Sequence, residues 1–167
     1  SAGQVLAVMD TQQLEAQKKQ AEASLQRAVI SVDTAKSLLS QREAEREAAA
    51  AVIGQREAEQ DAAERKLART EQLIRTNTTS QQTLDDDRAA AQRARAAVAA
   101  AKASLSASEA AIGAAKAQII DAEASVVAAQ AAIESIVADI NDSTLRSPRE
   151  GRVQYRVAQP GEVLSSG

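Results

Sequence analysis

The strongest constraint on this chain is a seven-residue repeat of apolar positions. Before residue 76, one series of mostly large residues comprises Leu25, Val32, Leu39, Arg46, Ile53, Gln60, Leu67 and Ile74. A companion series of mostly small residues comprises Leu14, Ala21, Ala28, Ala35, Arg42, Ala49, Arg56 and Ala63. Alternating spacings of four and three place both series on one face of a helix, as in a coiled-coil seam. The strict period of seven also predicts a left-handed supercoil.

The same repeat returns after residue 79. One series with the same period comprises Leu84, Ala91, Val98, Leu105, Ile112, Ile119, Val126, Ile133 and Ile140. Its companion positions are Ala94, Ala101, Ser108, Ala115, Ala122, Ala129 and Ile136. Neither segment contains a proline, so each is expected to form one long helix.

A single reversal separates the two helices. Residues Thr76–Thr79 favour turns and caps over helix interiors, which predicts a helix over residues 11–75, a tip over 76–79 and a second helix over 80–141. Because a tight turn joins sequence neighbours, the two helices are expected to pair antiparallel over a region of 11–141. The fold class is therefore mainly α, a long two-helix antiparallel coiled-coil hairpin.

Capping signals stand at both predicted helix starts. Asp10 with Gln13, and Thr79 with Gln82, have the spacing of a capping box. The acidic run Asp85–Asp87 suits the positive end of the helix dipole.

Four polar residues interrupt the seam of the first predicted helix near its middle: Arg42, Arg46, Arg56 and Gln60. In an antiparallel pair, Arg42 and Arg46 are expected near Gly113 and Glu109. One interpretation is a soft, bendable centre. The alternative is that the arginine stems cover the seam while their charged heads reach water.

The residue patterns at both ends of the chain predict β-strands. Residues 1–10 alternate apolar side chains, and residues 142–167 hold both prolines and three of the six glycines. A strand is expected over 152–157 and a shorter one over 162–164, with a type II turn at Pro160–Gly161. Since an isolated strand is not stable and matched helices return the chain to its start, the ends predict one small split β module.

Composition excludes several functions. The chain has no Cys and no His, which removes thiol chemistry, the usual zinc sites and imidazole general bases. Its net charge of −3 gives no reason to expect nucleic acid as a partner. Acidic residues fall on solvated helix faces with no sign of a pocket, so catalysis is not expected. No apolar run approaches the roughly 18 residues that span a bilayer, and no signal peptide is visible.

Residues 3–10 and 145–164 flank the hairpin as split β halves, and this arrangement resembles the membrane fusion proteins, or periplasmic adaptor proteins of the HlyD family. In that family a coiled-coil hairpin divides a lipoyl-like β-sandwich in two. Many members carry at the hairpin tip an Arg, a Leu four residues later and a Ser seven further on. Arg69, Leu73 and Ser80 have this spacing at the reversal. The resemblance thus implies a partner-binding tip, and a fragment that lacks the family's β-barrel and membrane-proximal domains and its N-terminal anchor.

The resemblance implies an adaptor of a bacterial tripartite efflux or secretion system. Its expected partners are a TolC-like outer-membrane channel, an inner-membrane transporter and further copies of itself, with six in the assembly. The hairpin length favours an ABC-type or major-facilitator transporter over an RND pump. The expected location is the periplasm, with the full-length protein anchored to the inner membrane.

Two alternatives compete with this reading. A structural coiled-coil spacer with no transport role explains the heptads equally well, but not the strand sequences at both ends. Pairing between residues 1–10 and the C-terminal segment would discriminate between the two. A cofactor-carrying lipoyl or biotinyl domain needs a Lys on an exposed hairpin, and the β segments contain none. No cofactor and no metal are therefore expected.

Overall fold

The computed structural model describes residues 1–152, Tyr155, Gln159 and Gly161. Its elements in chain order are β1 (Val5–Val8), α1 (Gln12–Arg75), α2 (Gln81–Asp142) and β2 (Thr144–Arg146). The chain divides into two compact units. One holds residues 1–25 with 128–167, and the other holds residues 26–127.

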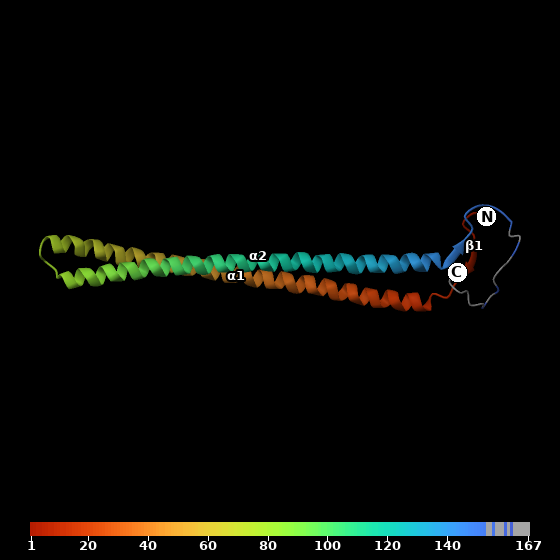
Figure 1. Ribbon diagram of the computed structural model, residues 1–167, viewed down its shortest axis with the longest axis horizontal. Helices are drawn as coiled ribbons and strands as arrows, with labels where there is room; N and C mark the ends of the chain where they lie inside the picture. The colour runs from red at the N-terminus through yellow and green to blue at the C-terminus, as the bar shows by residue number, and fades with distance from the viewer. Residues whose placement is uncertain (153–154, 156–158, 160, 162–167) are drawn as a thin grey trace. The chain divides into compact units, whose positions relative to one another are not determined.

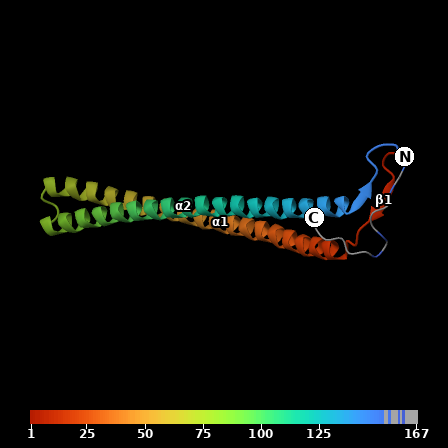
Figure 2. The ribbon, with the colours of Figure 1, turned by 45° about the vertical axis from the view of Figure 1, so that its right-hand side comes forward.

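Within residues 26–127, α1 and α2 lie side by side and wind around each other, with the reversal at one end (Figures 1 and 2). The predicted antiparallel hairpin is confirmed. The seam positions face inward, and Val32, Leu84, Ala91, Val98, Ala101 and Ala115 are the buried apolar residues of the described chain. Half of them are alanines, and such small side chains in the seam let the two helices approach closely.

The polar seam residues keep their heads in water. Arg42 and Arg56 are half-buried, and each guanidinium contacts a glutamate three residues on, Glu45 at 2.7 Å and Glu59 at 2.8 Å. At these two positions the geometry favours the interpretation in which arginine stems cover the seam. The glutamates also accept hydrogen bonds from Gln41 and Gln55, so the sequence QREAE forms the same cluster twice.

Arg46 lies next to Glu109 of α2, as the antiparallel register predicted, with Nε 3.5 Å from Oε1. It is the one exposed member of its seam series in α1. A shallow hollow lined by Glu43, Arg46, Glu109, Ile112 and Lys116 lies beside it.

The unit of residues 1–25 and 128–167 contains a two-stranded antiparallel sheet. β1 pairs with β2 in the register Val5 with Arg146, Ala7 with Leu145 and Val8 with Thr144. Leu6 occupies a bulge in this ladder. The amide of Gly3 donates to the carbonyl of Ser147 at 2.8 Å and extends the pairing beyond the strands. Residues 3–8 therefore pair with residues 144–147, as the split-module prediction requires of these segments.

The lipoyl-like character of this module stays a prediction. The strands expected over 152–157 and 162–164, and Pro160 of the expected turn, fall largely outside the described residues. Gly161 has φ +84°, the positive value that the third position of a type II turn needs. Val5, Leu6, Val8 and Leu145 are exposed. Two strands alone do not make a stable apolar core.

Candidate partner-binding tip

Helix α1 ends in a Schellman motif. Asn77 follows the last turn in the left-handed region, with φ 54°. The Thr78 amide donates to the Leu73 carbonyl at 2.9 Å, and the Asn77 amide donates to the Ile74 carbonyl at 3.1 Å. Asn accepts this backbone conformation more readily than most residues, which explains why the helix stops here without glycine or proline.

Threonine hydroxyls reinforce the turn. Thr76 Oγ1 donates to the Leu73 carbonyl at 2.9 Å and lies 2.9 Å from Thr78 Oγ1. The side chains thus satisfy backbone groups that the end of a helix leaves open. The reversal is a defined structure built from its own polar atoms.

Helix α2 begins with Ser80 as its N-cap, one residue later than predicted. Ser80 Oγ accepts the Thr83 amide at 3.1 Å and lies 2.8 Å from Thr83 Oγ1. The predicted capping box of Thr79 with Gln82 is wrong, because the neighbouring hydroxyl takes the capping position.

At the other helix start, Thr11 holds the N-cap position, because its carbonyl accepts the Glu15 amide at 2.9 Å. The carboxylate of Asp10, one residue earlier, accepts the Gln12 amide at 3.0 Å and not that of the predicted partner Gln13.

The three residues predicted for partner binding are all exposed around this turn. Arg69 and Leu73 lie one helical turn apart near the end of α1, and Ser80 lies at the start of α2. Leu73 is 45% exposed, whereas its neighbour Ile74 is half-buried in the seam. Leu73 therefore lies outside the seam, on the surface of the tip.

Beneath this surface lies a buried polar cluster that connects the helices. Thr70 and Asp87 are only 6% and 4% exposed. The Thr70 hydroxyl donates to Asp87 Oδ2 at 2.7 Å, and Lys66 Nζ lies 2.7 Å from Asp87 Oδ1. Both carboxylate oxygens are thus occupied by groups from α1. The carboxylate cannot move along the seam without losing these partners.

Electrostatics favour the ionised carboxylate at this position. The hydrogen bond from Lys66, and then that from Thr70, lower the pKa of Asp87, while desolvation by burial acts against them. The positive charges of Lys66 and Arg69 add to the lowering of this pKa. Arg69 therefore acts on the buried cluster while its side chain is exposed.

The sequence predicts a role for Asp87 only at the dipole of the helix start, but its carboxylate lies in the seam and contacts α1. The signal was the heptad itself, since Thr70 falls seven residues after Ala63 and Asp87 falls seven residues before Ala94. Following the repeat through polar residues would have placed both in the interface.

Further ion pairs join the helices away from the tip. Arg95 Nε lies 2.7 Å from Glu64 Oε1, and Lys102 Nζ lies 3.0 Å from Glu57 Oε1. The hydrogen bond from Arg95, and then that from Gln60, lower the pKa of Glu64. These side chains are largely exposed, so the pairs contribute more to register than to stability.

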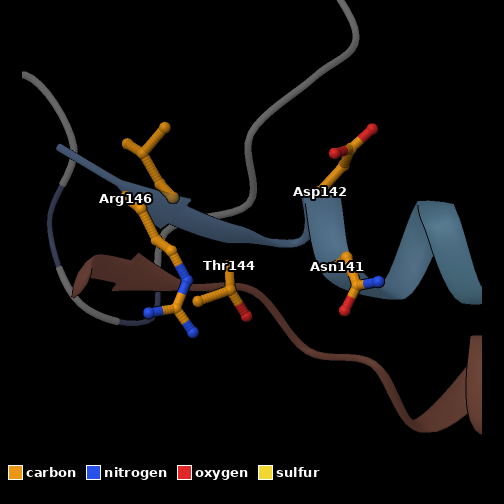
Figure 3. A pocket seen from close by; sticks show the side chains of 5 residues that line it. Asn141, Asp142, Thr144 and Arg146 are labelled. Atoms are coloured by element: carbon orange, nitrogen blue, oxygen red, sulfur yellow. The ribbon is translucent and has the colours of Figure 1, made fainter. Parts of the chain in front are cut away.

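A shallow hollow at the β2 end of α2 is lined mostly by polar residues. Asn141, Asp142, Thr144, Leu145 and Arg146 line it. Figure 3 shows the Asp142 carboxylate and the Arg146 guanidinium pointing away from each other. Across the described residues, no group of three or more metal-ligating side chains is found, and no helix has the length and hydropathy needed to cross a membrane.

Comparison with known proteins identifies the hairpin. The family model described as "RND MFP, alpha-helical hairpin domain" matches residues 45–112, a segment that contains the turn and parts of both helices. The match supports, on this segment, the resemblance to the α-helical hairpin of membrane fusion proteins that the sequence shows.

Among solved structures, the chain is similar to one titled "Structure of the periplasmic adaptor protein EmrA". The identity is 16% and the TM-score 0.48, over 98% of this chain. The chain spans 61% of the length of that protein. No curated protein sequence matches the chain.

Proposed function

We propose that this chain is the hairpin part of a periplasmic adaptor, which links an inner-membrane transporter to a TolC-like outer-membrane channel. The observation that carries the proposal is the membrane fusion protein match over the hairpin, with Arg69, Leu73 and Ser80 exposed at its turn. The function is mechanical, with no catalysis and no cofactor. The location is the periplasm, with the full-length protein held at the inner membrane.

The proposed contact with the channel uses three kinds of group. The Arg69 guanidinium offers planar hydrogen-bond donors, and the exposed Leu73 offers an apolar anchor. The Ser80 hydroxyl caps α2 and keeps a second role as a polar contact. The Lys66–Thr70–Asp87 cluster supports this surface, because it fixes the level at which α1 and α2 meet below it.

Hairpin length favours an ABC-type or major-facilitator transporter, since α1 has 64 residues and α2 has 62. The description of the matched family names RND members instead. Co-purification of the adaptor with its transporter from membranes distinguishes these classes, because the three kinds of transporter differ in fold and mass.

A structural spacer remains the competing function. A spacer function does not require β1 to pair with β2, yet the two strands form an antiparallel ladder. This pairing favours an adaptor, in which the hairpin is inserted in a β module. Assembly into a ring of six copies is part of the proposal.

The test is export in cells that carry Arg69→Asp. Reversing the charge should abolish export while helix content and expression stay normal, because the Arg69 side chain is exposed. Arg93→Asp is the matched control, since it reverses another exposed arginine that lies within α2, away from the turn. Normal export with Arg69→Asp, or equal loss with Arg93→Asp, would contradict the proposed role of the tip.

A further inference from the structure

Asn77 takes a backbone conformation at the reversal that glycine adopts more easily. Its φ is 54°, and no other residue except glycine has a positive φ in the part of the chain that the structure describes. Glycine is the usual residue at this position of a Schellman motif, because it has no Cβ atom to crowd the backbone in the left-handed region. The turn therefore needs the backbone of residue 77, but it does not need the asparagine side chain.

The hydroxyl groups around Asn77 are already used by the turn itself. Thr76 Oγ1 donates to the Leu73 carbonyl at 2.9 Å and lies 2.9 Å from Thr78 Oγ1. Ser80 Oγ accepts the Thr83 amide at 3.1 Å and caps α2. These side chains hold the reversal together before they can serve a second molecule.

The Asn77 carboxamide differs from these hydroxyls, because it is exposed and makes no hydrogen bond to any described residue. It offers two N–H donors and one carbonyl acceptor. The backbone that carries it is fixed, since the Asn77 amide donates to the Ile74 carbonyl and the Thr78 amide donates to the Leu73 carbonyl. A polar group on a fixed backbone loses little conformational freedom when a partner binds it.

We propose that the Asn77 carboxamide is a further contact of the tip with the channel. Its partner there is an uncharged group that both donates and accepts a hydrogen bond, as a peptide group does. Arg69 offers donors and a positive charge, and Leu73 offers an apolar surface, so neither supplies an uncharged acceptor. The inference rests on the proposed function of the tip, and it adds a residue outside the Arg69, Leu73 and Ser80 spacing.

Two substitutions at position 77 separate the side chain from the backbone. Asn77→Gly removes the carboxamide and suits the positive φ, so this variant should melt at the temperature of the parent or above it. Asn77→Asp keeps the shape of the side chain and its tolerance of the left-handed region. It keeps acceptors but loses both donors and gains a negative charge.

Capture of the channel in living cells measures the contact, with a photoreactive amino acid at position 73 of the protein. Asn77→Gly should lower the amount of captured channel about tenfold, because a hydrogen-bonding group of the channel then stays unpaired in the interface. Asn77→Asp should also lower capture. Gln92→Ala is the matched control, since it removes another exposed carboxamide from within α2 and should leave capture unchanged.

Several results would overturn the inference. Capture that Asn77→Gly leaves unchanged, or that Gln92→Ala lowers equally, would show that the Asn77 carboxamide is not a contact. A lower melting temperature of Asn77→Gly would place the role of the side chain inside the turn. Capture that Asn77→Asp preserves or raises would indicate a cationic or purely donating partner.

Failure of the proposed function gives a different result. If the parent captures no channel from position 73, the tip does not bind a channel, and both the proposed function and the role of Asn77 are wrong. If the parent captures the channel and Asn77→Gly captures it equally well, the proposed function stands and the role of Asn77 alone is contradicted.

Discussion

The Thr70 hydroxyl donates a 2.7 Å hydrogen bond to the carboxylate of Asp87, and this bond joins α1 to α2 inside the seam just below the turn. Apolar side chains would pack there with less desolvation. A polar pair at a seam position specifies register, because a slip of the helices leaves a buried carboxylate without its donors. The cluster of Lys66, Thr70 and Asp87 therefore sets how the tip surface is presented.

Thr70→Val should destabilise the hairpin by about 1 kcal/mol, because it removes one donor from a buried acceptor and keeps the side-chain shape. Chemical denaturation followed by circular dichroism measures the change. Thr70→Ser keeps the hydroxyl and serves as the control, with a smaller loss. Equal stability of the Val variant and the parent would mean that the hydrogen bond does not contribute.

Stability should depend on Asp87 in acid. The folded state lowers its pKa from the ordinary value of 3.8, so the contribution of Asp87 is fully present above that pH. It is lost as the pH falls through the lowered pKa. The difference in melting temperature between the parent and Asp87→Asn should accordingly narrow below about pH 4. A difference that stays constant from neutral pH into acid would exclude this linkage.

Ser80→Ala should cost up to about 1 kcal/mol, since the Thr83 amide loses the oxygen that caps α2. Ser106→Ala, an exposed serine in the interior of α2, should change stability by less than about 0.5 kcal/mol. Thermal unfolding of the two variants compares the stability lost at the N-cap with the stability lost at an exposed helix position. If both behave alike, Ser80 does not act as the cap.

Amide exchange should be faster over residues 42–60 than over residues 25–39. Arg46 interrupts the seam with an exposed side chain beside a hollow, and Gly54 weakens its helix by about 1 kcal/mol relative to Ala. Hydrogen exchange with mass spectrometry resolves the two segments. Uniform protection along α1 would argue against a soft centre.

The hairpin was predictable because its information is local and periodic. Leu25, Val32 and their successors repeat every seven residues, and a single lapse at Thr76–Thr79 leaves no other place for the reversal. The Arg46–Glu109 contact then followed from the antiparallel register.

The buried cluster and the N-cap of α2 were harder to predict from the sequence. The apolar repeat does not single out Thr70 and Asp87, because their burial depends on the hydrogen bond between them across the seam and not on hydropathy. Thr79 and Ser80 are adjacent hydroxyl residues, and only the backbone path of the turn decides which one caps α2.

The most direct test of the adaptor account is site-specific photo-cross-linking from the tip. A photoreactive amino acid at position 73 replaces an exposed leucine beside Arg69, and the same group at position 93 is the control within α2. In living cells, position 73 should capture an outer-membrane channel, identified by mass spectrometry, and position 93 should not. No channel from position 73, or equal capture from both positions, would contradict the central claim.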